Sequence, residues 1–248
     1  MIIDNDLLSI QQARILAENA FEAQKKLAAF TQERLDGIVE AVADAIEEHV
    51  QALAVMSQEE TDFGRWEDKL IKNRFVCGQV RRSLRDMRCV GVIAEDPQKR
   101  IMDIGVPVGV IVALCPATSP VSTTISTTLL AIKSGNALLF SPHPRAAKSI
   151  AKTLDIMIAA AHVHGLPEGC LGYLGTVTRS GTRELMGHAA TSLVMITGVP
   201  GMLAEARAAG KPLIYGGSGN GPVFIERTAD IDRAVRDVIV SKVFDNGI

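Results

Sequence analysis

Short apolar runs alternate with longer segments between residues 109 and 216, and this alternation restricts the fold more than any other feature of the sequence. The apolar runs are mostly aliphatic, and each ends in a turn rich in Pro, Gly, Ser or Thr. They are residues 109–114, 137–140, 171–174, 193–196 and 212–215. Such runs are typical of parallel strands that are covered on both faces. Repeated units of strand, turn and helix therefore predict an α/β fold with a Rossmann-like, doubly wound parallel sheet.

The segments between and after these runs are predicted to be helical. The one at 146–164 is stopped by Gly165 and Pro167, two residues that end helices. The others are residues 122–133, 179–188, 201–209 and 231–244.

The first 89 residues are predicted to form helices as well. From Leu35 to Leu53 the apolar residues recur at the spacing of one face of an amphipathic helix, and Thr31 suits its N-cap. Further helices are expected at about 10–29 and 66–87, with a break at Asp62-Phe63-Gly64.

Residues 90–106 contain two short, partly alternating segments on either side of Glu95-Asp96-Pro97-Gln98. This pattern predicts a hairpin or a pair of extended arms. We therefore expect N-terminal helices at 1–89, this arm at 90–106 and the sheet at 107–248.

Composition and charge exclude several classes of protein. Hydrophobic residues make up 47% and charged residues 22% of the chain, as in a soluble globular protein with an aliphatic core. The net charge of -2 gives no electrostatic reason to expect nucleic acid or an anionic membrane as a partner. The sequence shows no apolar stretch long enough to span a bilayer and no signal peptide at its start.

The cysteines indicate a reduced environment. Cys77, Cys89, Cys115 and Cys170 form no CxxC pair, so neither a zinc site nor a dithiol redox site is predicted, and no metal is expected. Scattered thiols in a chain of this length are typical of a cytoplasmic protein.

The turns that follow the predicted strands are the candidate binding loops, because ligands of doubly wound sheets bind beyond the carboxyl ends of the strands. These turns are residues 115–120, 141–145, 197–201 and 216–221. No strand is followed by the G-x-G-x-x-G sequence of an ordinary dinucleotide-binding fold.

Several blocks in these turns, in this order, resemble the aldehyde dehydrogenase superfamily. The first are Pro107-Val108-Gly109-Val110, Cys115-Pro116-Ala117-Thr118-Ser119-Pro120 and Lys133-Ser134-Gly135-Asn136-Ala137. The later ones are similar to its CoA-acylating branch, and they are Phe140-Ser141-Pro142-His143-Pro144-Arg145, Thr197-Gly198-Val199-Pro200-Gly201-Met202, Gly216-Gly217-Ser218-Gly219-Asn220 and Phe244-Asp245-Asn246-Gly247.

The resemblance implies a binding site for NAD or NADP at these turns. It places Thr197, Gly198, Pro200 and Gly201 under the pyrophosphate, where a helix starting near Gly201 would offer backbone N–H groups to the phosphates. The full set of cofactor-binding residues implied in this way is Pro116, Ala117, Thr118, Ser141, Pro142, His143, Arg145, Thr197, Gly198, Val199, Pro200, Gly201, Gly216 and Gly217.

The turn at 141–145 bears on the choice of cofactor. Ser141 and Pro144 stand where most members of the family have a Lys and a Glu that contact the adenosine ribose. Without that carboxylate a 2′-phosphate is not repelled, and Arg145 and Lys148 are nearby cations, so NADP as well as NAD is expected to be accepted. The alternative is that Arg145 is a solvated residue at a helix start. His143 either packs on the adenine or caps the helix.

The resemblance also implies the chemistry. Phe244-Asp245-Asn246-Gly247-Ile248 is similar to the run that leads into the family's nucleophilic cysteine, which none of the four cysteines matches. Cys115 ends a strand beside the site, but a small buried residue is the favoured interpretation. Thr118 stands where hydrolytic relatives have an oxyanion-binding Asn, and Gly216 where they have the Glu that activates water. Release of the acyl group to coenzyme A is therefore expected.

We accordingly expect the cofactor-binding domain of a CoA-acylating aldehyde dehydrogenase that acts on a small aldehyde and forms a homo-oligomer through the arm at 90–106. Its catalytic domain would follow residue 248, so this chain alone is expected to be inactive. Two alternatives stay open, namely a dinucleotide-binding fragment without catalysis and a hydrolytic semialdehyde dehydrogenase.

Overall fold

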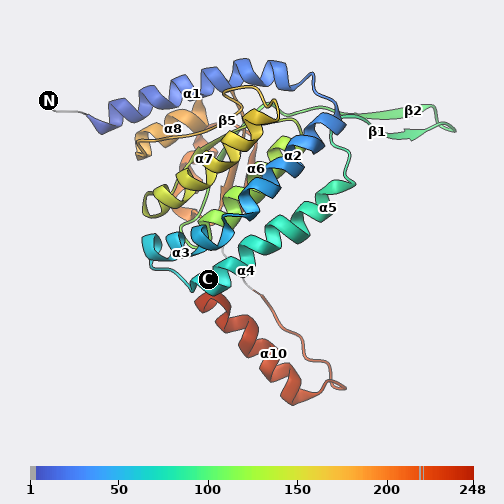
Figure 1. Ribbon diagram of the computed structural model, residues 1–248, viewed down its shortest axis with the longest axis vertical. Coiled ribbons are helices and arrows are strands. Elements are labelled where there is room, and N and C mark those ends of the chain that lie inside the picture. The colour runs from blue at the N-terminus through green and yellow to red at the C-terminus, as the bar shows by residue number, and fades with distance from the viewer. Residues whose placement is uncertain (1–3, 218, 220) are drawn as a thin grey trace.

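The computed structural model describes residues 4–217, 219 and 221–248. A five-stranded parallel sheet forms its centre, with helices on both faces, and a hairpin and a C-terminal helix project from the body (Figure 1). Ser218 and Asn220, which belong to one of the family-like blocks, lie outside the described residues. None of the described helices is long and apolar enough to cross a membrane.

The sheet confirms the predicted doubly wound fold. Its strands are β3 (Val110–Leu114), β4 (Ala137–Ser141), β5 (Leu171–Tyr173), β6 (Thr191–Thr197) and β7 (Leu213–Gly216). They run parallel in the order β5-β4-β3-β6-β7, so the chain moves from the centre to one edge and then returns to build the other half. Every residue of β3 and β4 is buried, which explains why these runs contain no polar alternation.

Helices cover both faces of the sheet, and one face has a second helical layer. On one side lie α6 (Pro120–Lys133) and α7 (Ala147–Val163), and α2 (Gln32–Glu47) packs across both of them. On the other side lie α1 (Asn5–Leu27) and α8 (Arg179–Gly187), which pack on each other. Because both faces are covered, the side chains of the central strands are removed from water, which is the main stabilising contribution to such a core.

The N-terminal region is helical as predicted, but its boundaries differ. The apolar stripe at 35–53 spans two helices, since α2 ends at Glu47 and α3 (Val50–Thr61) begins after a turn of two residues. Ile46, Val50 and Leu53 are all buried, so the stripe continues across the turn and hides the break. Thr31 caps α2 as expected, its hydroxyl accepting the Arg34 N–H at 3.4 Å.

The predicted helix at 66–87 is interrupted. It consists of α4 (Trp66–Phe75), the π-helical turn η1 (Val76–Val80) and α5 (Arg81–Arg85). A π-helical turn adds a residue to one turn of an otherwise continuous helix, and hydrophobic spacing does not reveal it.

The expected hairpin is confirmed. Strands β1 (Gly91–Asp96) and β2 (Ile101–Gly105) pair antiparallel and extend away from the body (Figure 1). Several apolar side chains of this arm are exposed, namely Val92, Ile93, Ile101, Met102 and Ile104.

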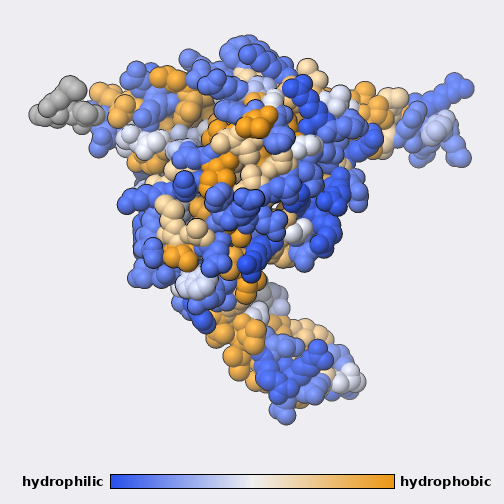
Figure 2. All heavy atoms as spheres, viewed as in Figure 1, coloured by the Kyte–Doolittle hydropathy of each residue, from blue (hydrophilic) through white to orange (hydrophobic). Residues whose placement is uncertain are grey.

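The C-terminal segment stands clear of the sheet. Helix α10 (Ile231–Val243) ends in the 3-10 turn η4 (Phe244–Gly247), against which it packs. None of the residues of α10, all of which the structure describes, is buried. Apolar residues gather on the surface of this projecting part (Figure 2), among them Phe224, Val235 and Ile239.

Candidate functional site

The predicted binding loops converge at one edge of the sheet. Strands β3 and β6 are neighbours although two strands separate them in sequence, and all five strands end at the same side. The Gly198 N–H donates to the Gly216 carbonyl at 2.8 Å, which ties the turn after β6 to the end of β7. A Cβ atom on Gly198 would lie 3.4 Å from Pro116 Cβ, so the turn after β3 lies directly beside it.

The backbone conformation of Gly198 favours glycine. Its φ of 64° is in the left-handed region that residues with a Cβ rarely adopt. The neighbouring loop residues are exposed and so remain accessible to a ligand. These exposed residues are Thr197, Pro200, Gly201, Gly216 and Gly217, whereas Pro116 and Ala117 are buried beneath them.

A cavity of about 260 Å³ opens between the ends of β3 and β4 and the start of α8. Four of the predicted residues line it: Ser141, Pro142, His143 and Val199. Sequence reasoning missed the contribution of the turn after β5 and of the start of α8, and it missed Met202 in η3 (Pro200–Met202). The missed lining residues are Val177, Thr178, Arg179, Thr182 and Met202. The turn after β5 could have been predicted as part of the site, because β5 is a parallel strand whose carboxyl end reaches the same edge of the sheet.

The residues of the turn after β4 have distinct contacts. Ser141 Oγ lies 2.7 Å from Thr182 Oγ1 and is buried, so it joins β4 to α8. His143 Nδ1 accepts the Arg145 N–H at 3.1 Å, which makes it the cap of η2 (Pro144–Ala146). Burial, together with the positive charge of Arg145, lowers the pKa of His143.

Arg145, which was expected either near a 2′-phosphate or as a solvated residue at a helix start, is exposed and contacts the end of α3. Its Nη2 donates to the Thr61 carbonyl at 2.7 Å, and its guanidinium carbon lies 4.7 Å from the centre of the Phe63 ring. Those contacts direct it toward the end of α3, and it does not line the cavity. The Lys148 N–H donates to Glu60 at 2.8 Å, so α3 also caps the start of α7.

The helix expected at 201–209 begins differently. It consists of the 3-10 turn η3 followed by the short helix α9 (Leu203–Ala208). Pro200 opens η3, and the Met202 N–H closes it by donating to the Val199 carbonyl at 3.1 Å. Because its first turn is 3-10, this segment presents a shorter α-helix beyond β6 than predicted.

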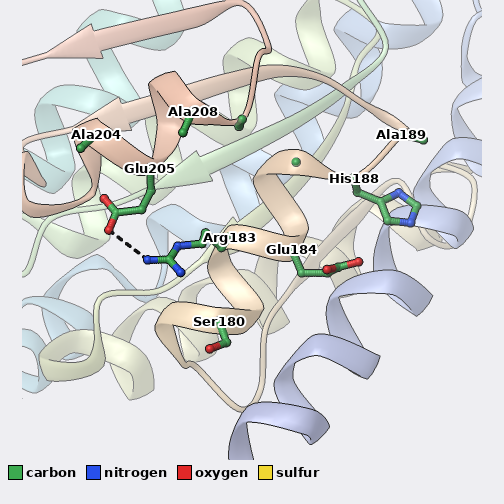
Figure 3. Close-up of a pocket in the computed structure, with 10 residues that line it drawn as sticks. Ser180, Arg183, Glu184, His188, Ala189, Ala204, Glu205 and Ala208 are labelled. Atoms are coloured by element: carbon green, nitrogen blue, oxygen red, sulfur yellow. Dashed lines mark ion pairs between the residues drawn. The ribbon is translucent and has the colours of Figure 1, made fainter.

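A larger open cleft of about 1040 Å³ lies between α8 and α9 (Figure 3). Arg183 points across it toward Glu205, at 3.5 Å. Arg179 also bonds Glu205, through Nε at 2.7 Å, and this bond is the largest cause of the lowered pKa of that carboxyl group. No sequence pattern indicated this cleft, because its lining residues are ordinary helix-surface positions.

Gly216 has room beside it. A Cβ atom built there would meet only the Ile196 carbonyl within 4 Å, at 3.9 Å. Among the described residues, therefore, no carboxylate lies within 4 Å of the point where a side chain at 216 would begin.

The C-terminal residues 244–248 lie close to the turn after β3, which contains Thr118. Lys69 Nζ, on α4, donates to the Thr118 carbonyl at 2.6 Å and lies 3.3 Å from the Asp245 carboxylate of η4. Lys72 Nζ donates to the same carboxylate at 2.6 Å. These two lysines, which the sequence did not single out, bring Thr118 and residues 244–248 together.

The thiols inside this chain are poor nucleophiles. Burial raises the pKa of Cys77, Cys115 and Cys170 to about 12 in each case. Cys115 Sγ accepts the Thr124 hydroxyl at 3.8 Å and is 1% exposed, in agreement with its interpretation as a small buried residue. In the described part of the chain, no three His, Cys, Asp or Glu side chains are grouped so as to hold a metal ion.

Comparison with known proteins places this geometry in context. The model of the aldehyde dehydrogenase family matches residues 4–247. The bifunctional aldehyde-alcohol dehydrogenase of Escherichia coli K12 is 39% identical over 240 residues, which cover 97% of this chain and 27% of that protein. The succinate-semialdehyde dehydrogenase (acetylating) of Clostridium kluyveri is 34% identical over 233 residues, which are 94% and 51% of the two chains. This chain thus spans about half or less of the length of these relatives.

Comparison with solved structures leads to the same family. A probable aldehyde dehydrogenase from Listeria monocytogenes superimposes with a TM-score of 0.95 at 46% identity, covering 99% of this chain and 54% of that one. An engineered glycolyl-CoA reductase with bound NADP+ has a TM-score of 0.80 at 26% identity, covering 94% and 53%. A Rhodopseudomonas palustris propionaldehyde dehydrogenase with bound propionyl-CoA has a TM-score of 0.81 at 27% identity, covering 94% and 52%.

Proposed function

This chain belongs to the aldehyde dehydrogenase family, and on that premise we propose that it is the cofactor-binding part of a CoA-acylating aldehyde dehydrogenase. The complete enzyme would oxidise a small aldehyde to an acyl-CoA through a thioester on a cysteine outside this chain. When bound, NAD or NADP supplies the acceptor for the hydride that leaves the aldehyde.

One observation carries the cofactor part of the proposal. Turns from β3, β6 and β7 meet at the point where the strand order reverses, and Gly198 there has a left-handed backbone and lies beside Pro116. Beside them, Pro142 and His143 line a cavity that extends to the start of α8. A glycine turn that allows close backbone approach beside such a crevice fits a dinucleotide pyrophosphate.

The acylating subtype rests on Gly216. A hydrolytic enzyme needs a base at this place to activate water, and a missing base lowers the rate of a proton-transfer step by roughly 10²–10⁴-fold. A thiol is a stronger nucleophile than water and is partly ionised near neutral pH. Coenzyme A is therefore the acyl acceptor in this proposal. The related enzymes that are described as acetylating or carry bound propionyl-CoA support this choice.

The proposal includes NADP as well as NAD. Neither Ser141 nor Pro144 has a carboxylate that would repel a 2′-phosphate. The cation nearest to that cavity is Arg179, which lines it, and it takes the role that sequence reasoning gave to Arg145. The bound NADP+ in a structural relative is compatible with this assignment.

We also propose that residues 107–248 form the cofactor-binding sheet, with residues 1–89 as supporting helices and 90–106 as an oligomerisation arm. The arm exposes backbone edges and apolar side chains on both β1 and β2, as expected for strands that pair with a partner. The assembly that fits this surface is a homo-oligomer.

The test uses the complete protein and the variant Gly216→Glu. The unmodified protein is expected to reduce NAD or NADP with an aldehyde only when CoA is present and to yield acyl-CoA. Because a side chain fits at 216, Gly216→Glu should release free acid without CoA. Gly216→Gln, which has the same size without a base, is the matched control. Chromatography of the products distinguishes acid from acyl-CoA, and free acid from the unmodified protein would refute the acylating subtype.

A further inference from the structure

The last turn of the chain has an unusual backbone. Asp245, Asn246 and Gly247 have φ values of 49°, 58° and 77°, so three consecutive residues are in the left-handed region. Only the glycine adopts this conformation readily. Such a conformation persists where surrounding contacts impose it, and it is commonly found at functional sites.

Asp245 has the contacts that impose it. The side chain is fully buried, and Oδ1 accepts the Arg65 N–H at 2.8 Å. Its own N–H donates to Asp68 Oδ2 at 2.9 Å. Gly64, with φ 69°, makes room for it, because a Cβ atom there would lie 1.9 Å from Asp245 Oδ1. The start of α4 is thus shaped around this carboxylate.

Two lysines complete the contact. Lys72 Nζ donates to Asp245 Oδ2 at 2.6 Å, to the Ile248 carbonyl at 3.0 Å and to Ser119 Oγ at 3.2 Å. Lys69 Nζ lies between Asp245 Oδ2 and the Thr118 carbonyl. We name Lys69, Lys72 and Asp245 the α4 latch. It joins the turn after β3 to residues 245–248 through one helix.

The charged groups of the α4 latch are buried or partly buried, so each needs its partners. Burial lowers the pKa of Lys69, and the neighbouring Asp245 carboxylate opposes that change. A buried charge that loses its partner is strongly destabilising, so each of these groups depends on the others.

The α4 latch also anchors the C-terminal segment. Among the described residues, every hydrogen bond between 221–248 and the rest of the molecule involves Asp245 or Ile248. Helix α10 contributes no buried side chain. The position of residues 245–248 relative to the sheet is therefore set by α4.

We propose that the α4 latch is a positioning device for the reaction: it holds the backbone of residues 245–248 against the Thr118–Ser119 turn, so that the segment after Ile248 enters the site beside the cofactor crevice. The inference rests on the proposed function, in which the reactive thiol follows Ile248. Lys69 and Lys72 are positioning residues, since they act through the backbone of other segments.

The first arm of the test measures the latch in this chain without any activity. Hydrogen–deuterium exchange is compared for the unmodified chain, Lys72→Met, Lys72→Arg and Lys152→Met, where Lys152 is an exposed lysine on α7. Lys72→Met should lower protection of the Arg65 and Asp245 amides by at least about tenfold, the factor that corresponds to losing hydrogen bonds to a charged group. Lys72→Arg should restore part of it, and Lys152→Met should change nothing.

Amides of β3 and β4 serve as the internal reference for folding. If Lys72→Met also loses protection there, Lys72→Gln, which keeps a donor and removes only the charge, replaces it. Unchanged protection of Arg65 and Asp245 in a folded Lys72 variant would overturn the α4 latch.

The second arm measures acyl-CoA formation by the complete protein. Lys72→Met should lower kcat by at least about tenfold while KM for the nicotinamide cofactor stays unchanged, and Lys72→Arg should recover part of kcat. Unaltered kcat despite faster exchange would overturn the positioning role. A complete unmodified protein that makes no acyl-CoA, with exchange responding as expected, would overturn the proposed function and still support the latch as a structural anchor.

Discussion

In the turn after β4, adjacent residues make different contacts and therefore have different roles. Ser141 bonds Thr182, His143 caps η2, and Arg145 binds the end of α3. Four residues of this turn line the cavity, namely Ser141, Pro142, His143 and Pro144, whereas Arg145 does not. The chemical type of a residue indicates what it can bind, whereas its neighbours decide what it does bind.

His143 predicts a pH dependence of stability. Burial lowers its pKa below the ordinary 6.5, so the unfolded chain takes up the proton first as the pH falls. Its contribution is thus complete above pH 6.5 and is lost as the pH drops through the lower folded pKa, because protonated Nδ1 cannot accept the Arg145 N–H.

Urea denaturation at stepwise lower pH checks this expectation against His143→Asn, which keeps a capping acceptor but does not titrate. The variant should lose less stability than the unmodified chain on acidification below pH 6.5. Identical pH profiles would show that His143 makes no such contribution.

The cysteines give a second prediction for single residues. The pKa values of about 12 for Cys77, Cys115 and Cys170 leave almost no thiolate near pH 8, and all three are buried. Iodoacetamide should therefore modify Cys89 alone in the native chain. Mass spectrometry of the alkylated protein, with Cys89→Ser as control, provides the measurement, and modified Cys115 would contradict its assignment as an inert core residue.

The sequence could identify a site residue where the residues next to it form a recognisable strand or turn. Ser141, Pro142 and His143 follow a buried strand, so their place at the ligand edge could be predicted. Lys69 and Lys72 could not, because their partners Thr118, Asp245 and Ile248 are brought to them only by the tertiary fold.

Among the structural elements, α8 and α9 add the part of the site that no motif indicated. The first turn of α8 carries Arg179, which lines the cavity and bonds Glu205 of α9. Helix surfaces of this kind have no distinctive sequence, whereas β3 and β4 were predictable because each is a short, fully buried and mostly apolar run. The π-helical turn η1 and the 3-10 turn η3 were missed since neither alters hydrophobic spacing in a recognisable way.

Arg179 at the start of α8 predicts a cofactor preference. Arg179→Ala should raise the Kd for NADP by about tenfold, as for the loss of a charge-assisted hydrogen bond, and leave the Kd for NAD nearly unchanged. Calorimetric titration with both dinucleotides measures the two effects, and Arg236→Ala on the exposed helix α10 is the control. An equal loss for both cofactors would assign Arg179 a structural role instead.

The molecule as a whole combines a well-packed sheet with projecting parts that expose apolar surface. The hairpin β1–β2, the edge strand β7 and α10 all carry exposed aliphatic side chains, including Ile104, Ile214 and Ile239. Extended apolar surfaces of this kind mark contact sites. In our proposal, the hairpin contacts another subunit.

Titration of this chain with NAD and NADP, followed by hydrogen–deuterium exchange of the saturated sample, tests the central claim most directly. The account predicts saturable binding with joint protection of residues 141–143, 177–179 and 197–202. Gly198→Val should abolish both while β3 stays protected, because its side chain would meet Pro116 in a left-handed backbone position. Absence of binding, or protection on a face away from the carboxyl ends of the strands, would contradict the account.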